Sequence, residues 1–575
     1  MDQRILEIDC EKREIRTREV PGDYELLGGR GFTSTFIGEE VDPAAHPLGD
    51  GNVLVMATGL MAGSTLSSAN RLSAGAKSPL TGGIKESNCG GVASFKLGRL
   101  GIRALVFRGR AAGAVSGSGG EGRASAADSA AGPGTAGFPS LGLKISKDGA
   151  TFEDLSFVKG KNTYEASRLL QEKYGKKAGL LLIGTAGERG LPAACINITD
   201  MDGEPCRNFG RGGLGAVMGS KGIKAIIIDD AGCPNPYAKN EEVKRVVREF
   251  SDKLRAHPVT GKNFALYGTC MVLQNVNALG GLPTRNFSEG VFEDAEAIGA
   301  QSLHDTIESR GGMSAHACMP GCVIRCSNKY VHPDGSPFVG SLDYETICLL
   351  GSNIGLSDHD QIAELNYMCN DIGVDTIETG VALGVLAEGG VFSFGDFDAA
   401  RALIGEIGDG TPLGRLIGSG SVSCGRAYGV RHVPAVKNQG MAAYDPRAIK
   451  GLGVTYAQSP MGADHTAGNA ILLDVDHQDP NAQVEPVRDL NINITVLDML
   501  GVCFFTGRVS LGDTSLVEEI VHAFTGKKMS FEELRGMAKR VLIAERRFNS
   551  GAGLGEETDR LPEFMNYEKL PPHDV

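Results

Sequence analysis

Two patterns of hydrophobic positions divide this chain. Up to about residue 230, short apolar runs are bounded by glycine and charge, which is typical of β-strands. These runs are 52–58, 104–110, 178–184 and 224–230. From about residue 236, apolar residues instead recur every three or four positions, as in amphipathic helices. The predicted helices are 240–257, 360–370, 375–388 and 398–408, with a further helix after a capping box of Ser530 and Glu533.

The predicted class is therefore α+β, in several domains, because 575 residues exceed what one core usually holds. We expect a β-rich domain over 1–230, a mainly helical domain over 236–425 and a second helical domain over 426–575. Segment 111–142 is rich in Gly, Ala and Ser without periodicity, which predicts a flexible surface insertion with no catalytic content. No fixed-period repeat is visible.

Charge and composition narrow the class of protein. The net charge of −13 argues against nucleic acid as a partner, because phosphate backbones need a basic face. The N-terminus is charged from its second residue, and no apolar run is long enough to span a membrane. We therefore expect a cytoplasmic protein without a membrane partner. Thiols stay reduced in that compartment, so the cysteines are expected to be core residues or metal ligands.

Twelve of the thirteen cysteines fall into two groups, and the remaining one, Cys89, lies in the glycine-rich segment 70–101. Cys318, Cys322 and Cys326 lie close together, and Cys503 stands alone far along the chain. Three clustered thiolates and a remote fourth are typical of a cubane 4Fe–4S cluster, which would carry single electrons through the protein. Eight scattered cysteines are expected to be small core residues: Cys10, Cys195, Cys206, Cys233, Cys270, Cys348, Cys369 and Cys424.

Glycine-rich segments in the β-rich part suggest a phosphate-bearing ligand. Segment 207–228 has a G-x-G-x-x-G spacing from Gly210, but a strand-like run follows within ten residues, so a dinucleotide fold is rejected. Its N–H groups, with Arg207, Arg211 and Lys221, could cradle phosphate, although a tight turn with solvated charges explains it equally well.

Segments 70–101 and 28–32 (GGRGF) have a similar composition. The first contains Arg71, Asn88 and Gly90 among glycines, serines and lysines. Two or three such loops in one β-rich domain suggest a single large ligand that carries phosphates.

Two further segments resemble each other, NDIGVD at 370–375 and DMLGVC at 498–503. Each follows a helix-like stretch. A glycine at a helix C-terminus, followed by an apolar residue and an acceptor, fits a ligand docked on helix ends. Ordinary C-capping explains each segment alone, and their similarity is what favours a shared role.

Together these motifs resemble the tungsten-dependent aldehyde:ferredoxin oxidoreductases, through nearly the whole chain. The resemblance rests on GGRGF, NRLSAGAKSPLTGG, ESNCGG, RNFGRGGLGAVMGSK, the cysteine cluster, DYETI (343–347), NDIGVDTIETG, SPMGADH (459–465) and DMLGVC. It implies a β-rich domain that forms the base for a metal held by two pyranopterins, covered by two helical domains. It also implies oxidation of an aldehyde, with water, to the carboxylic acid. The reverse reaction, reduction of the acid, is compatible with the resemblance. Electrons would leave singly through a 4Fe–4S cluster to ferredoxin or a ferredoxin-like small subunit.

The resemblance assigns roles to individual residues. The implied pterin contacts are Arg71, Asn88, Gly90, Arg207, Asn208, Gly210 and Arg211, with Asn370, Val374 and Asp375 of one paired segment and Asp498 and Val502 of the other. The implied cluster ligands are Cys318, Cys322, Cys326 and Cys503. Tungsten, with molybdenum as the alternative metal, is implied, as is a magnesium between the pterin phosphates near Asn88 and Asn208. A homo-oligomer is compatible with the family.

Glu345 and His465 match active-site positions of the family and are the candidates for proton transfer. A carboxylate at a helix N-terminus and a structural histidine are the alternatives. The sequence departs from the family in its C-x3-C spacing at Cys318, in Asn370 where Asp is usual, and in Met461 where some relatives carry Arg.

Two other functions compete with this one. A radical S-adenosylmethionine enzyme has a similar cysteine triad, but its chain should be built of repeated βα units. A non-catalytic electron-transfer subunit would not need three phosphate-type loops.

Overall fold

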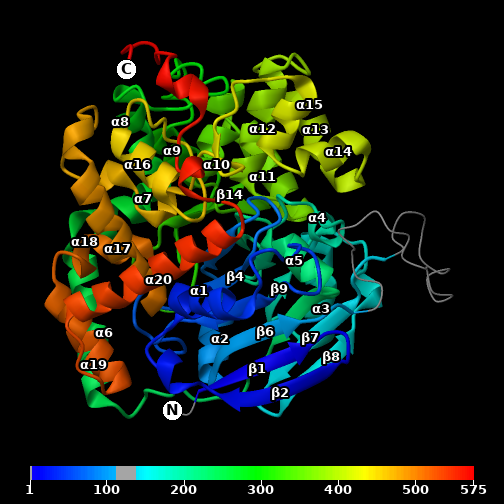
Figure 1. Ribbon diagram of the computed structural model, residues 1–575, viewed down its shortest axis with the longest axis vertical. Helices are drawn as coiled ribbons and strands as arrows, with labels where there is room; N and C mark the ends of the chain where they lie inside the picture. Colours follow the sequence, from blue (N-terminus) through cyan, green and yellow to red (C-terminus); the bar gives the residue numbers. More distant parts are fainter. Residues whose placement is uncertain (1–2, 112–136) are drawn as a thin grey trace.

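Two six-stranded sheets form most of the first 230 residues (Figure 1). The structure is a computed structural model, and it describes residues 3–111 and 137–575. In spatial order, the first sheet holds β2 (Glu14–Glu19), β1 (Arg4–Asp9), β6 (Ile102–Arg108), β3 (Leu54–Thr58), β4 (Leu72–Lys77) and β5 (Ile84–Cys89). The second holds β8 (Gly149–Asp154), β7 (Leu141–Ser146), β12 (Ile223–Ile228), β9 (Gly179–Leu182), β10 (Ile196–Ile198) and β11 (Arg207–Phe209).

The two sheets repeat one topology. In each, the first two strands form an antiparallel hairpin and the first strand pairs in parallel with the last, while the remaining neighbours are antiparallel. Helices occupy matching places, α1 (Gly29–Glu40) and α3 (Thr163–Tyr174) after the hairpin, α2 (Ala93–Arg99) and α5 (Leu214–Ser220) before the last strand. The sequence shows no fixed-period repeat, but the backbone is duplicated.

The predicted strands are confirmed, and the glycine-rich segments take regular structure. GGRGF begins helix α1 and does not form a loop of its own. Arg30 in it pairs with Glu545 at 2.8 Å and with Asp498 at 3.3 Å. Segment 70–89 is largely the β4–β5 hairpin. Most of the predicted 111–142 insertion lies outside the described residues, and its last two residues belong to β7.

The predicted helices are also confirmed. They are α6 (Glu241–Ala256), α11 (His359–Ile372), α12 (Thr376–Glu388), α13 (Phe397–Asp409) and α20 (Phe531–Gly551), the last with its Ser530–Glu533 capping box formed. A long helix, α17 (Val484–Leu500), precedes Cys503. Helices α1, α17 and α20 pack together beside the first sheet, while α11 to α13 lie over the second (Figure 1).

A small sheet within the helical part was not predicted. It consists of β13 (Met313–His316), β14 (Ser327–Val331) and β15 (Pro337–Gly340). The three clustered cysteines lie in the β13–β14 connection. One hydrophobic core joins residues of both six-stranded sheets to the helices that cover them. The boundary at 425 stays a prediction.

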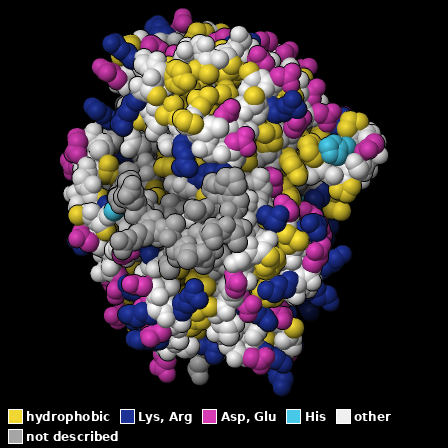
Figure 2. Space-filling view, turned by 90° about the vertical axis from the view of Figure 1, so that its right-hand side faces the viewer, with side chains coloured by type: hydrophobic (Ala, Val, Ile, Leu, Met, Phe, Trp, Pro, Cys, Tyr) yellow, Lys and Arg dark blue, Asp and Glu magenta, His cyan; other side chains and the backbone are white. Residues whose placement is uncertain are grey.

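The outer surface carries charges of both signs. Where grey atoms do not cover this face, Figure 2 shows Lys and Arg interspersed with Asp and Glu, and not charge of a single sign. Within the described residues no single helix has the length and apolar character to cross a membrane. One bent pair, Pro480–Leu500 with Phe504–Ser510, passes that test jointly, on length and composition alone.

Candidate functional site

One cavity between the sheets and the helices collects nearly all of the predicted site residues. Its wall includes Arg71, Asn88, Gly90, Arg207, Asn208, Gly210, Arg211, Glu345, Asn370, Val374, Asp375, His465, Asp498, Cys318, Cys326 and Cys503. Lys221 does not line this cavity, because its Nζ donates instead to Gly49 O and Asn52 O. Of the residues to which the resemblance assigns a role, only Cys322 and Val502 are not part of this wall. Both are buried next to residues that are. Segments separated by more than 400 residues therefore meet at one place.

The duplicated topology gives the cavity two equivalent sides. Asn88 near the end of β5 donates from Nδ2 to Asp498 Oδ1 at 3.2 Å. Asn208 in β11, the matching strand of the second sheet, donates from Nδ2 to Asn370 Oδ1 at 2.9 Å. The substitution of Asn for the family's usual Asp at 370 thus keeps the hydrogen bond and removes the charge.

The paired segments end their helices in the same way. Gly373 follows α11 with φ 81° and Gly501 follows α17 with φ 72°, a left-handed conformation that favours glycine. Each segment then docks on one half of the β-rich region, since Asp375 N donates to Ala193 O at 3.0 Å and Cys503 N to Ser68 O at 2.8 Å. The helix-end prediction is confirmed.

The Asp375 carboxylate makes more contacts within the protein than its sequence context suggests. Its carboxylate caps α12, accepting from Ile377 N and Glu378 N, each at 3.1 Å. It also lies 3.4 Å from Arg211 Nε. A ligand would therefore share this carboxylate with α12.

Three arginines line the cavity, of which Arg207 and Arg211 are buried and Arg71 is half-buried. Arg71 donates to the backbone carbonyl of Asn88 at 2.8 Å, and Arg207 donates to Ser341 Oγ at 2.9 Å. Burial opposes the charge of Arg71, but neighbouring cysteines, Cys503 first, and Asp498 raise its pKa above the usual value. Burial likewise opposes the charge of Arg211, and Asp375 with three further carboxylates raises its pKa. All three guanidiniums stay cationic.

The loop that carries the clustered cysteines is fixed against segment 64–71. Val323 N donates to Ser67 Oγ at 3.1 Å, and Ser68 Oγ lies 3.5 Å from Cys322 Sγ. Ser68 also accepts from Cys503 N, so one serine joins the loop to the remote cysteine. On the other side, Gly91 N donates to Cys318 O at 2.9 Å. The fold thus brings three thiols and the predicted fourth to one edge of the cavity.

Glu345 and His465 face each other. Glu345 lies in the first turn of α10 (Tyr344–Leu349), where Ala443 N donates to its Oε2 at 2.7 Å. His465 Nε2 lies 3.3 Å from Glu345 Oε1. Burial raises the pKa of Glu345 above its ordinary 4.5, against the lowering effects of His465 and the Ala443 hydrogen bond. The pair comes from different helical segments and opens on the cavity.

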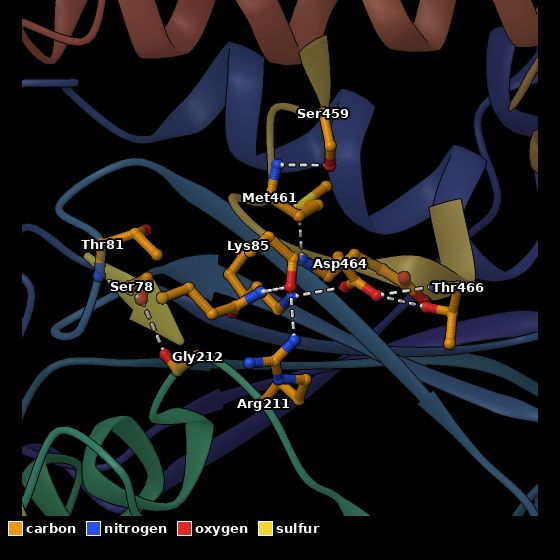
Figure 3. A network of polar contacts seen from close by, with 12 residues as sticks. Ser78, Thr81, Lys85, Arg211, Gly212, Ser459, Met461, Asp464 and Thr466 are labelled. Atoms are coloured by element: carbon orange, nitrogen blue, oxygen red, sulfur yellow. Dashed lines mark hydrogen bonds and ion pairs between the residues drawn. The ribbon is translucent and has the colours of Figure 1, made fainter. Parts of the chain in front are cut away.

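A buried ion pair beside this site was missed from the sequence. Lys85 Nζ lies 2.9 Å from Asp464 Oδ2, and Figure 3 shows Lys85 and Arg211 converging on the segment that holds Asp464. Lys85 and Arg211 hold the pKa of Asp464 far below its usual range despite burial. The GADH motif contained the signal, because an Asp directly precedes His465. Lys85, one of the lysines of the glycine-rich segment 70–101, is thus committed to this carboxylate.

The cavity wall also carries buried polar atoms without hydrogen-bond partners, which an extended polar ligand could satisfy. Among the described residues, these buried atoms have no aligned hydrogen-bond partner: Arg207 Nε, Asn208 Oδ1, Asn366 Nδ2, Glu345 Oε1 and His465 Nδ1. Buried polar atoms are rarely left unpaired unless a ligand, ion or water satisfies them. Donors and acceptors on both sides, with three arginines, suit a phosphate-bearing and heterocyclic cofactor.

An apolar cavity of about 600 Å³ adjoins the site and shares part of its wall, including Phe264, Phe504 and Phe505. The rest is mostly aliphatic, from Val259, Met271, Leu279, Leu473, Leu490, Ile494 and Leu511. Asn275, His477 and Arg508 add polar groups to this wall. A small organic molecule with an apolar body could occupy this space, which shares part of its wall with the cavity that Glu345 and His465 line.

Comparison with known proteins agrees with this geometry. The family model for the N-terminal domain of aldehyde ferredoxin oxidoreductase matches residues 5–116 and 134–230, and the model for its domains 2 and 3 matches residues 245–574. The tungsten-containing aldehyde ferredoxin oxidoreductase of Pyrococcus furiosus is 29% identical, and that of Pyrococcus horikoshii 30%, each over 99% of this chain and 92% of the relative.

A more distant relative and one solved structure share the architecture. The aliphatic sulfonate oxidoreductase WOR-like subunit of Pyrococcus furiosus is 25% identical over 81% of this chain. The BamBC active-site complex of benzoyl coenzyme A reductase, solved with 1,5-dienoyl-CoA, superposes with a TM-score of 0.76 at 19% identity, over 99% of this chain and 92% of that one. The predicted fold is confirmed, and the radical S-adenosylmethionine alternative is not favoured. This chain belongs to the aldehyde ferredoxin oxidoreductase family, a family of oxidoreductases.

Proposed function

We propose that this chain oxidises an aldehyde to its carboxylic acid and passes the electrons singly to an iron–sulfur acceptor protein. One observation carries the proposal: a doubled polar cradle, three of the four predicted cluster cysteines and a Glu–His pair open on a single cavity. The names of the relatives support the same activity and support tungsten as the metal.

The cradle would hold two pyranopterins, one on each side. Asn88, Gly90, Arg71 and Asp498 would contact one, and the matching set around Asn208, Gly210 and Asn370 the other. A magnesium between their phosphates is part of the proposal. When bound, a tungsten centre of this kind supplies a two-electron acceptor and a Lewis acid. No side chain in the cradle is required to ligate the metal, so molybdenum is the alternative.

Proton handling falls to Glu345 and His465. An aldehyde and a water together lose two electrons and two protons when they become a carboxylic acid. Glu345 Oε1 has no aligned hydrogen bond and faces His465 Nε2 at 3.3 Å. A carboxylate with a raised pKa is a better base near neutral pH, and His465 can relay the proton away. Arg211 holds neighbouring carboxylates in place without titrating.

The apolar cavity supports an aldehyde with an apolar body. Its aromatic and aliphatic wall adjoins the Glu–His pair, so burial of such a body would hold the carbonyl at the site. Aryl and branched aliphatic aldehydes fit this wall better than small hydrophilic ones. The cluster ligands Cys318, Cys322, Cys326 and Cys503 would conduct the electrons outward.

The test is an anaerobic assay of protein produced with tungstate. We expect aldehyde-dependent reduction of benzyl viologen, with benzaldehyde giving a lower KM than glyoxylate. Carboxylic acid should form at one molecule per two electrons. A protein that carries metal and cluster but reduces no dye with any aldehyde would contradict the activity.

A further inference from the structure

A groove of about 660 Å³ lies beside the loop that carries the clustered cysteines. Gly321 and Val323 of that loop line one part of it, and α6 lines another. Helix α6 contributes Lys244, Arg248 and Arg255, all exposed. Among the described residues, no Asp or Glu lines this groove. We call it the cationic groove.

The three cations share one face of α6. Residues four and seven positions apart lie on the same side of a helix, so Lys244, Arg248 and Arg255 point the same way. Arg248 has no ion pair within the described chain. Lys244 pairs with Glu241 at 2.7 Å and Arg255 with Asp252 at 3.2 Å, but both are exposed pairs that contribute little. The positive charge therefore remains available to a partner.

The cysteine loop adds a further cation. Arg325 lies between Cys322 and Cys326, and its side chain is exposed. Within the described residues it too has no ion pair. The whole chain has a net charge of −13, so the positive charge of this local group beside the cysteines is opposite in sign to that of the chain. Charge of one sign in a groove attracts a partner of the opposite sign.

The surface around the groove is rigid. The cysteine loop is tied to segment 64–71 by the bonds from Val323 N to Ser67 Oγ and from Ser68 Oγ to Cys322 Sγ. At Gly321, which has φ 82°, an added Cβ would meet Thr65 O at 3.2 Å. A docking face that does not rearrange loses little entropy on binding. The same ties keep the cysteines close to the groove.

We propose that the cationic groove is the docking site of an acidic one-electron carrier protein of the ferredoxin type. The proposal rests on one part of the proposed function, namely that the four cysteines hold a cluster. Complexes between redox proteins are small and short-lived, and charge complementarity mainly sets their association rate. An acidic patch on the carrier would lie against Arg248 and Arg325, with its cluster next to the cysteine loop.

The test measures electron transfer without an aldehyde. Enzyme reduced with stoichiometric dithionite is mixed by stopped flow with an oxidised, acidic 4Fe–4S ferredoxin. The variants are Arg248→Glu, Arg248→Glu with Arg325→Glu, and the control Lys176→Glu. Lys176 is exposed between α3 and β9, on the other side of the molecule from α6 in Figure 1, and its substitution changes the net charge as much as Arg248→Glu alone. Iron content and the reduced-cluster resonance confirm that each protein is intact.

We expect the second-order rate constant at low ionic strength to fall about tenfold or more in the double variant, and its salt dependence to flatten. The control should keep the wild-type rate, and reduction of benzyl viologen should not slow in any variant. An unchanged rate constant in the double variant, or an equal loss in Lys176→Glu, would overturn the proposal. Wild-type protein that transfers electrons but oxidises no aldehyde would contradict the proposed function and leave the groove supported.

Discussion

At the scale of single residues, the proposed chemistry depends on how the protein sets the charge of Glu345. Its carboxylate is buried beside His465 and anchored by one backbone N–H. Burial outweighs these stabilising contacts and raises the pKa. A carboxylate whose pKa is raised takes up a proton more readily than an ordinary one, which suits a general base. Lys85 and Arg211 keep the neighbouring Asp464 ionised, so Asp464 cannot act as the general base.

Glu345→Gln keeps the shape of the side chain and removes its basicity. Turnover of a saturating aldehyde should fall by about 10²–10⁴, the usual contribution of general acid–base catalysis. His465→Asn should lower turnover less if the histidine only orients the carboxylate, and equally if it relays the proton. Metal and iron content should match wild type in both variants. Near-wild-type turnover in Glu345→Gln, with chemistry rate-limiting, would make the carboxylate structural.

The raised pKa of Glu345 also predicts a pH dependence. Activity requires the ionised carboxylate, so it should decline as pH falls through the pKa of Glu345. Because that pKa is raised, the acid limb of kcat/KM should lie above pH 4.5, the ordinary value for this side chain. The limb should disappear from the residual activity of Glu345→Gln. A limb that persists unchanged in the variant would assign the titration to another group.

At the scale of elements, helix ends and strand ends build the site in two matching halves. Asn88 with Asp498 and Asn208 with Asn370 form equivalent bonds, each between a strand of one sheet and the last turn of a long helix. The halves differ in charge. Burial raises the pKa of Asp498 to about 6, with Arg30 and Arg71 opposing the rise, whereas Asn370 is neutral. A cofactor bound between them would experience an asymmetric field.

Cys503 follows the end of α17 and is the proposed fourth cluster ligand. Cys503→Ser should lose or convert the 4Fe–4S centre and abolish reduction of the protein acceptor, while the fold remains. Cys369→Ser is the matched control, because Cys369 is a buried cysteine of α11 outside the cavity wall. Iron analysis and low-temperature electron paramagnetic resonance give the readout. A normal cluster resonance in Cys503→Ser would refute the assignment.

Arg71 and Arg211 serve opposite sides of the cradle. Arg71→Ala or Arg211→Ala would each remove charge-assisted hydrogen bonds, worth about 1.5–3 kcal/mol apiece. Each purified variant should contain less tungsten and less pterin than wild type, measured by mass spectrometry of the metal and fluorescence of oxidised pterin. Arg168→Ala on the exposed face of α3 is a control that should load normally. Wild-type metal content in both cavity variants would contradict the cradle.

At the scale of the whole molecule, the sequence predicts the class of fold and most site residues, but not their spatial relations. Periodicity located β3, β6, β9, β12 and the long helices because their apolar patterns are regular. It could not show that the two sheets share a topology, since β-strand pairing is set by contacts distant in sequence. Lys85 and Asp464 were missed together for the same reason, because their ion pair joins segments 379 residues apart. GGRGF was expected to be a loop but begins helix α1, because the glycine-rich start of a helix has the same composition as a loop.

The central claim is that one chain encloses a tungsten bis-pterin centre and a single 4Fe–4S cluster. The most direct measurement is quantitative metal analysis of protein produced anaerobically with tungstate, molybdate and iron supplied together. The account predicts tungsten and iron at a ratio of about one to four, with two pterins per metal and no stoichiometric zinc. Iron without tungsten or molybdenum, or metal without pterin, would contradict it.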